Sequence, residues 1–291
     1  GIYASYTGIE EQTLEAYWFW LRDAQDIEDS AGNLVVEWVQ NLVGVDQYGN
    51  TNLHTLGLRG AGAFGAFDYE AEVAYQFGEA DQVGALYRPV FYGDDSARYD
   101  TWGANLEAGY TFDVSWQPRL YLGYAYLGGE DNSDISFGEW LEALFNPFYT
   151  APASVSFNRL FSNRAYNYVL EASDLSNAQI FRGGVGVVPT EQIELNLELM
   201  YLRSVAAFSR PVVPFLTFWT EENSKDLGWA AMLDISYAYS DDLSLAVGWT
   251  HLFTGDGLEQ GNFNSSNGTD FNGGTDDTGA DYAYFQVDLS F

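Results

Sequence analysis

Two carboxylates come closest to the spacing that catalysis needs: Glu70 and Glu72 are separated by one residue. On a β-strand, residues i and i+2 share a face, and a glycoside hydrolase needs two carboxyl groups about 5–10 Å apart. The spacing permits such a pair. The chain holds 42 Asp and Glu residues, however, so one pair among them has little specificity. The sequence therefore favours no enzymatic activity.

Other reactive residue types are scarce. The chain has no Cys, which excludes thiolate nucleophiles, disulfides and Cys-based metal sites. The two His, His54 and His251, fall on separate predicted strands, where we expect them at a membrane interface. The Asp/Gly-rich run from Thr254 to Gly257 lacks the EF-hand calcium-loop pattern. We therefore expect no cofactor and no metal site.

Composition narrows the class of protein. Lys and Arg number 11 against 42 Asp and Glu, giving a formal net charge of -31. Such acidity argues against nucleic acid and against an anionic membrane surface as partners. Aromatic residues make up 17% of the chain, and no apolar run reaches the length of a transmembrane helix. This balance is typical of an outer-membrane β-barrel with aromatic girdles.

Strict alternation of apolar and polar residues is the dominant pattern. In residues 191–201, for example, Ile193, Leu195 and Leu197 alternate with charged or amide side chains. A soluble β-sandwich also alternates, but these segments are about twice the usual strand length. The sequence therefore predicts an all-β fold, a transmembrane antiparallel β-barrel. Its eleven strands are expected at 1–8, 12–23, 52–64, 67–78, 101–112, 118–128, 178–188, 191–202, 226–240, 243–254 and 280–291.

The links between these strands alternate between tight turns and long segments, within a single domain covering residues 1–291. Outer-membrane barrels have short periplasmic turns and long extracellular loops. The long loops are expected near 24–51, 79–100, 129–177, 203–225 and 255–279. The first and last strands then run in the same direction and cannot pair antiparallel. We expect at least one strand before residue 1, the alternatives being a strand missed within a long link or closure by another chain.

The link 129–177 carries an apolar load too large for a solvated loop, so we expect it to fold onto the barrel mouth or into the lumen. Its stretch from Phe137 to Phe145 has helical spacing. Four of its residues are candidates for a gate: Arg159, Arg164, Phe157 and Phe161. For the two Arg, the alternative is an ion pair within the loop.

Charged residues on the polar faces of the strands should line the lumen. Arg59, Arg119 and Arg182 lie on polar faces, and Arg22 and Arg203 lie at strand ends. A guanidinium in a narrow lumen can bind a passing carboxylate bidentately. Alternatively, each Arg pairs with a wall carboxylate and holds the wall together. Seven acids are also expected to point inward: Glu70, Glu72, Glu107, Glu194, Glu198, Asp234 and Asp288.

Aromatic residues have two interpretations. Most Trp and Tyr near strand ends suit the membrane interface. The run from Tyr17 to Trp20 is aromatic on both faces of its strand, so one aromatic face must point inward, where it could stack on sugars. At the C-terminus, an alternating apolar series looks like the signature that outer-membrane assembly machinery recognises. Its members are Phe285, Val287, Leu289 and Phe291.

Several short stretches resemble the alginate export family. They are Ser156 to Tyr166, Ser173 to Ala178, Tyr3 to Asp23, His54 to Arg59 and Phe67 to Glu70. The resemblance implies a monomeric barrel of about 18 strands, of which this chain would be the C-terminal portion. It also implies a passive channel for an anionic polysaccharide in the outer membrane of a Gram-negative bacterium. The expected partners are the lipid bilayer, lipopolysaccharide, the assembly machinery and periplasmic export proteins.

The inward acids depart from the basic pore that the family resemblance implies. Two alternatives therefore stay open. One is a general or solute-specific diffusion porin, and the other is a plugged barrel with a structural or surface-interaction role. A basic lumen would favour the polyanion, an acidic or mixed lumen would favour cations or neutral solutes, and a plugged barrel would not conduct.

Overall fold

A computed structural model describes most of the chain. The described residues are 1–23, 51–79, 97–129, 136–145, 153–154, 156–158, 176–207, 209–211, 218–222, 224–240, 242–258 and 279–290. Eleven strands of one sheet dominate these segments. They are β1 (Ile2–Tyr6), β2 (Gln12–Asp23), β3 (Thr51–Phe64), β4 (Phe67–Glu79), β5 (Ala97–Thr111), β6 (Arg119–Leu127), β8 (Ala178–Thr190), β9 (Ile193–Ser204), β12 (Asp226–Ala238), β13 (Leu243–Thr254) and β14 (Gly279–Leu289).

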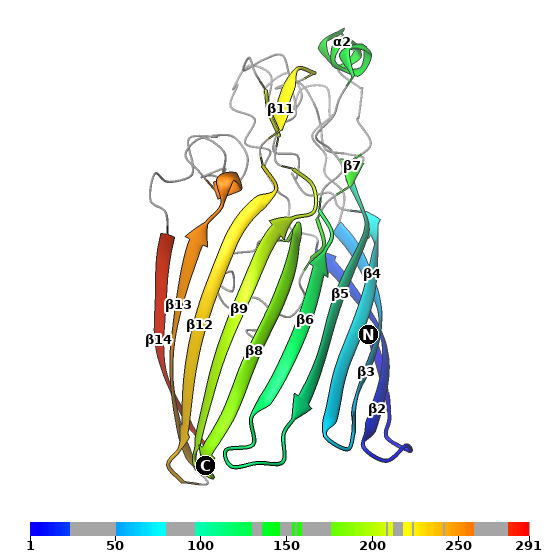
Figure 1. The fold of residues 1–291 in the computed structure, drawn as a ribbon. Helices are drawn as coiled ribbons and strands as arrows, with labels where there is room; N and C mark the ends of the chain where they lie inside the picture. The colour runs from blue at the N-terminus through cyan, green and yellow to red at the C-terminus, as the bar shows by residue number, and fades with distance from the viewer. Residues whose placement is uncertain are drawn as a thin grey trace.

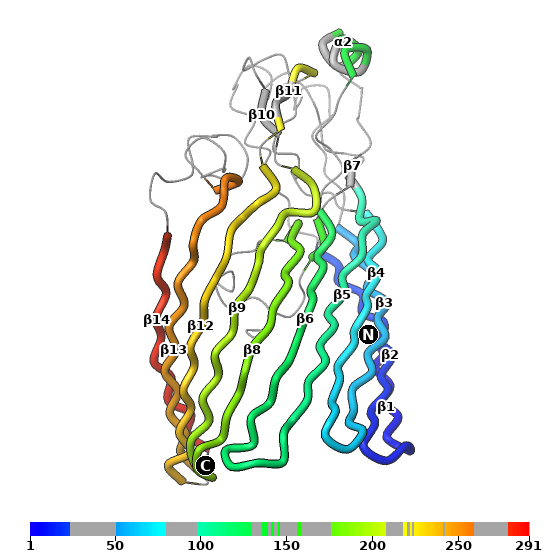
Figure 2. Tube along the Cα trace, viewed as in Figure 1, coloured from blue at the N-terminus to red at the C-terminus, as the bar shows by residue number. Residues whose placement is uncertain are grey.

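The eleven strands form one antiparallel sheet in chain order, from β1 at one edge to β14 at the other. Every pairing joins strands that follow one another in this order, so the sheet is a simple meander. The tilted strands curve together into a barrel wall (Figures 1 and 2). With ten antiparallel steps between them, β1 and β14 run in the same direction. The expectation of at least one strand before residue 1 stays a prediction.

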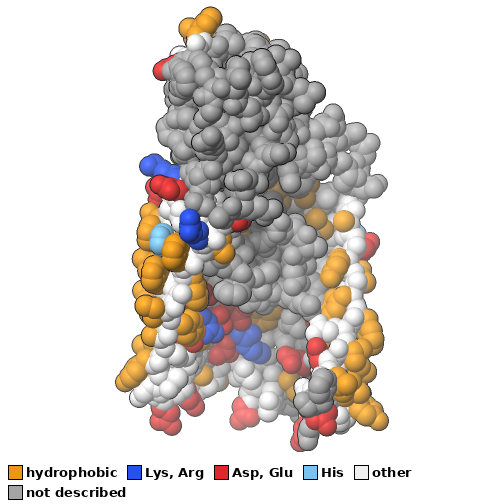
Figure 3. Space-filling model, turned by 180° about the vertical axis from the view of Figure 1, so that it is seen from behind, with side chains coloured by type: hydrophobic (Ala, Val, Ile, Leu, Met, Phe, Trp, Pro, Cys, Tyr) orange, Lys and Arg blue, Asp and Glu red, His pale blue; other side chains and the backbone are white. Residues whose placement is uncertain are grey.

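Alternation divides the wall into two chemically different faces. Large apolar side chains on the outer face are exposed, among them Leu122 at 74% and Phe285 at 70%. Along the same strands, the alternate residues turn to the inside of the curve and are mostly polar or small. Figure 3 shows hydrophobic side chains along the outer edges of the wall and charged side chains in the hollow between them. An apolar exterior with a polar interior is the pattern of a transmembrane barrel.

The short turns within the described residues all lie at one end of the sheet (Figure 1). The link between β3 and β4 is two residues, with Gly65 at a φ of 64° that suits glycine. Trp116 and Gln117 also have positive φ, 71° and 43°, in the turn before β6. The long links leave the sheet at the opposite end. The assignment of the turn end to the periplasm and of the long links to the cell exterior stays a prediction.

Minor elements lie in the long links. The helix α2 (Phe137–Phe145) occupies the stretch whose spacing predicted it. A short strand β7 (Ala153–Ser154) pairs parallel with β5, β10 (Ser209–Pro211) pairs with β11 (Thr220–Glu222), and a 3-10 turn, η1, spans Asp256–Leu258. In the described part of the chain, no helix has the length and apolarity needed to cross a membrane.

The prediction of an all-β antiparallel barrel fold is confirmed, with small differences at strand ends. The first strand, expected over 1–8, spans only Ile2–Tyr6. Strand β8 continues to Thr190 through a register shift against β9 between Val187 and Thr190. Pro189 lies in this interval, and because proline has no N–H to donate, an irregular pairing there is expected.

Candidate functional site

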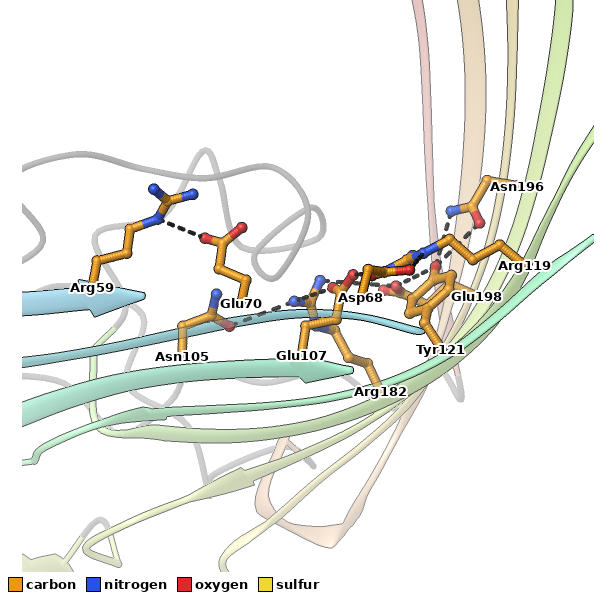
Figure 4. A network of polar contacts seen from close by, with 10 residues as sticks. All are labelled: Arg59, Asp68, Glu70, Asn105, Glu107, Arg119, Tyr121, Arg182, Asn196 and Glu198. Carbon is orange, nitrogen blue, oxygen red and sulfur yellow. Dashed lines mark hydrogen bonds and ion pairs between the residues drawn. The ribbon is translucent and has the colours of Figure 1, made fainter. Parts of the chain in front are cut away.

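The candidate site is the charged stretch of the inner wall across β2 to β9. Register places Glu15, Arg59 and Glu72 beside one another on three adjacent strands, so they share a face. Glu107 and Arg182 continue this face on β5 and β8, through the pairings of both with Gly123 on β6. Figure 4 shows the side chains of the network converging on the concave side of the sheet.

Arg59 joins two neighbouring strands. Its Nη1 lies 2.5 Å from Glu15 Oε2, and its Nε donates to Glu70 Oε1 at 3.1 Å. The Arg59 side chain remains 30% exposed. It is therefore paired, yet still reachable from the lumen.

Arg119 makes a denser set of contacts on the same face. It donates to both carboxylate oxygens of Asp68, at 3.0 and 2.5 Å, and to Glu107 Oε1 at 2.7 Å. Its guanidinium carbon also lies 5.0 Å from the centre of the Tyr121 ring, within cation–π range. The Arg119 side chain is 31% exposed, similar to that of Arg59.

Arg182 differs from the other two because it is almost fully buried. Its Nη2 lies 2.7 Å from Glu107 Oε2 and its Nη1 lies 4.0 Å from Glu198 Oε2, with both Arg182 and Glu198 side chains 2% exposed. Tyr121 donates a hydrogen bond of 2.6 Å to Glu198. Glu107 thus bridges Arg119 and Arg182. A pair this deeply buried needs its partners, since a lone charge there would be costly.

Long side chains reach these partners by crossing glycines. Tyr17 on β2 passes over Gly57 on β3 and donates to Glu72 on β4 at 2.5 Å, and a Cβ on Gly57 would come within 1.9 Å of its ring. The same three-strand crossing recurs four more times on the inner face of the described strands. Its members are Tyr121 over Gly184 to Glu198, Tyr284 over Gly248 to Asp234, Arg119 over Gly109 to Asp68, and Arg182 over Gly123 to Glu107.

A piece of the 129–177 link lies against the inner wall. The fully buried Gln76 on β4 donates to the Asn158 carbonyl and accepts from the Asn158 N–H, both at 2.7 Å. The Phe157 ring lies over Gly103 of β5, where a Cβ would be 2.5 Å away. The expectation that this link folds inward is met for these residues. The other gate candidates, Arg159, Phe161 and Arg164, lie outside the described residues.

Register corrects two of the expected lumen residues. Arg22 shares a face with Trp18 and Trp20 on β2, and Arg203 shares one with Leu199 on β9. Both Arg therefore lie on the outer face near the long-link end. The position of a residue at a strand end does not determine which face of the sheet it lies on. Residues an even number of positions from Glu15 on β2 or from Glu198 on β9 share the inner face, and Arg22 and Arg203 are an odd number away.

The seven expected acids do lie on the inner face by register. Asp234 is in register with Asn196, two residues from Glu198, whereas Glu194 and Asp288 lie farther toward the turn end of the sheet. Two further acids, Glu15 and Asp68, were missed although each is a direct Arg partner. Asp68 precedes Glu70 by two residues, so the same alternation could have found it.

The outer face carries the remaining candidates. His54 stacks against Trp18 and Phe77, at ring-centre distances of 5.8 and 5.0 Å, and His251 Nδ1 lies 2.9 Å from Asp281. No cluster of three potential metal ligands occurs among the described residues. Three members of the proposed assembly signature are exposed on β14: Phe285, Val287 and Leu289. The fourth, Phe291, lies outside the described residues.

A curved antiparallel sheet with an apolar outer face and a charged inner face defines the wall of an outer-membrane β-barrel. The model of the family described as "Alginate export" matches residues 1–270, nearly the whole chain. The chain belongs to the alginate export family.

Solved structures give a weaker likeness. The chain is similar to a ferric enterobactin receptor mutant (PfeA) of Pseudomonas aeruginosa in complex with enterobactin, with 13% identity, a TM-score of 0.41, and coverage of 89% of this chain and 34% of the receptor. It is also similar to the siderophore receptor PirA of Acinetobacter baumannii, with 10% identity, a TM-score of 0.39, and coverage of 89% and 34%. The chain spans about a third of the length of these receptors. No curated protein matches it.

Proposed function

We propose that this chain forms the wall of an outer-membrane channel of the alginate-export type, through which a carboxylate-bearing polysaccharide leaves the cell by passive diffusion. The family match over residues 1–270 supports this function. The proposed partners are the bilayer with its lipopolysaccharide, the outer-membrane assembly machinery, and periplasmic proteins that deliver the polysaccharide. In this mechanism the channel only binds and orients the polysaccharide.

Two of the three inward Arg suit contact with a passing polyuronate. Arg59 and Arg119 are each about a third exposed and each has two carboxylate partners. A uronate carboxylate can replace one of these partners, so that the guanidinium exchanges one charged hydrogen bond for another of similar strength. Arg182, at 2% exposure, instead holds the wall. The proposed gate includes Phe157, which lies against β5, and Arg159, Phe161 and Arg164, which follow it in the sequence and lie outside the described residues.

A specific observation favours a second candidate, a diffusion porin for cations or neutral solutes. Three guanidinium groups contact five carboxylates, namely Glu15, Asp68, Glu70, Glu107 and Glu198. The network alone therefore carries two surplus negative charges (five minus three), before Glu72, Glu194, Asp234 and Asp288 are added. An acidic lumen raises the local concentration of cations.

The deciding experiment is the zero-current reversal potential of the full-length protein in a planar bilayer under a salt gradient. The polyuronate channel should be anion selective, and Arg59→Gln and Arg119→Gln should each shift the reversal potential toward cation selectivity. Cation selectivity of the unmodified protein would overturn the polyuronate substrate and support the second candidate. A conducting protein of either selectivity would exclude the plugged barrel.

A further inference from the structure

Three aromatic rings occupy the inner face of the wall at its β1–β2 edge. Tyr3, Tyr17 and Phe19 lie on the same side of the sheet as Glu15 and Arg59. The ring centres of Tyr3 and Tyr17 are 6.1 Å apart with planes 9° from parallel, and those of Tyr17 and Phe19 are 5.1 Å apart at 29°. The three side chains form a continuous row, named here the aromatic platform.

The rings of the platform lie along the wall instead of projecting from it. Tyr17 reaches across Gly57 to Glu72, two strands away, and a Cβ on Gly57 would collide with it at 1.9 Å. Phe19 lies over Gly1 in the same way, where a Cβ would be 2.5 Å from the ring. A ring that rests on glycine and extends over the neighbouring strand turns one face toward the lumen. The Tyr3 ring, 9° from the plane of Tyr17, then presents the same face, and the Phe19 ring is tilted from Tyr17 by 29°.

Tyr121 shows what distinguishes the platform from wall packing. It makes the same crossing, over Gly184 to Glu198, but it is only 8% exposed and the Arg119 guanidinium lies over its ring. In the platform, Tyr17 and Phe19 remain partly exposed although β2 has a paired strand on each side. The same architecture therefore yields one covered ring and one row of rings within reach of a solute.

Hydrogen-bonding groups border the platform. The Tyr17 hydroxyl donates to Glu72, and Glu15, on the same face as Tyr3 and Tyr17, pairs with the partly exposed Arg59. A pyranose ring has an apolar C–H face and a rim of hydroxyls. It thus fits a flat aromatic surface, whose electron-rich face attracts C–H groups, with charged acceptors and donors at its side. Apolar contact area combined with a few fixed polar groups is the usual composition of a small-molecule site.

We propose that Tyr3, Tyr17 and Phe19 form a stacking platform for the pyranose rings of a saccharide chain, with Glu15, Arg59 and Glu72 bonding its hydroxyls. This proposal rests on the proposed function, because it gives the saccharide a binding surface inside the channel. The platform recognises the sugar ring and not its charge. It should therefore bind a neutral saccharide as well as a uronate.

Single-channel block of the full-length protein in planar bilayers tests the platform. The probes are maltohexaose, which is neutral, and a mannuronate hexamer. Phe19→Leu and Tyr3→Leu should each shorten the residence time of both probes by about threefold to tenfold, the contribution of one stacked ring. Tyr17→Phe keeps the ring and should retain most of the block. Trp18→Leu, on the same strand but on the outer face, is the matched control and should leave the residence times unchanged.

The outcomes separate the two proposals. Block of the unmodified protein that stays the same in Phe19→Leu and Tyr3→Leu would overturn the platform and leave the channel function standing. Equal shortening in Trp18→Leu would also overturn the platform, since the effect would then come from the strand and not from the inner face. Absence of block by either saccharide in the unmodified protein would overturn both the platform and the polysaccharide channel. Heat-modifiable migration on gels verifies that each variant is folded.

Discussion

At the scale of single residues, burial separates arginines that look equivalent in the sequence. Arg59, Arg119 and Arg182 all alternate onto polar faces, and each contacts two acidic residues. The Arg182 side chain is 2% exposed, whereas the other two are 30% and 31% exposed. Water can replace a lost partner at Arg59 but not at Arg182. Arg182 therefore stabilises the wall, whereas Arg59 and Arg119 are accessible to a solute.

Replacing Arg182 with Met should destabilise the protein by about 3–5 kcal/mol, because the buried Glu198 would lose its arginine partner, while Glu107 would keep Arg119. Arg59→Met should cost only about 0–1 kcal/mol, as for an exposed pair. Unfolding by guanidinium chloride in lipid vesicles measures the stability change of both variants. Adding Glu198→Gln to Arg182→Met should recover much of the loss. Equal losses for Arg182→Met and Arg59→Met would contradict the distinction.

At the scale of strands, the glycines of the inner wall make room for side chains from neighbouring strands. The crossing of Tyr17 over Gly57 ties β2, β3 and β4 together through one side chain. Gly60, three residues along the same strand, faces outward and meets nothing closer than Leu14 Cδ2 at 3.5 Å. The two glycines therefore differ in role although both lie in β3.

Gly57→Ala should displace the Tyr17 ring and break its bond to Glu72, at a cost of about 1–3 kcal/mol, the usual range for overpacking. Gly60→Ala is the control and should be neutral or slightly stabilising, because alanine is less flexible in the unfolded chain. Chemical unfolding of both variants in vesicles provides the comparison. A neutral Gly57→Ala would show that the crossing contributes nothing to the wall.

The anchored segment at Phe157 and Asn158 is a second feature at this scale. Gln76 satisfies both backbone groups of Asn158 and also donates to Thr55 at 3.1 Å. Gln76→Leu should release the segment from the wall, because the backbone N–H and C=O groups of Asn158 would lose their hydrogen-bond partners. The expected result is a larger or more frequently open single-channel conductance. Gln286→Leu, whose amide bonds the nearby Asp288, should leave the conductance unchanged, and an unaltered Gln76→Leu channel would exclude a gating role.

Strand positions could be predicted from the sequence because the period-2 alternation is local and persists for about ten residues per strand. The face of Glu70 or Glu198 follows from the same count. The partners of these residues could not be predicted, since Tyr121 and Glu198 meet across β8, 77 positions apart. Arg22 and Arg203 were misplaced because strand ends carry too few alternating residues to fix the face. The mixed charge of the inner wall, in contrast, could be predicted from the sequence.

At the scale of the whole molecule, the outer face must match the hydrocarbon core of a membrane. Aromatic side chains contact one another across strands near the long-link end: Tyr124 and Phe181 lie 4.9 Å apart, and Tyr201 and Trp229 also lie 4.9 Å apart. Below them the outward residues are largely aliphatic, such as Leu197 and Leu199, which are 50% and 56% exposed. Such exposure would be unfavourable in water, and it is the favourable arrangement in lipid.

A charged substitution on the outer face should therefore lower the free energy of unfolding more when the residue lies deeper in the membrane. Leu199 lies near the middle of β9, whereas Leu289 lies at the last position of β14, at the turn end of the sheet. In vesicles, Leu199→Arg should lower the free energy of unfolding by about 2–4 kcal/mol, and Leu289→Arg by about 0–1 kcal/mol. Both residues are more than half exposed, at 56% and 64%, so in a water-soluble protein the two substitutions would cost equally little. Equal small effects in vesicles would thus contradict a membrane-spanning wall, while a cost that follows depth would support it independently of any family likeness.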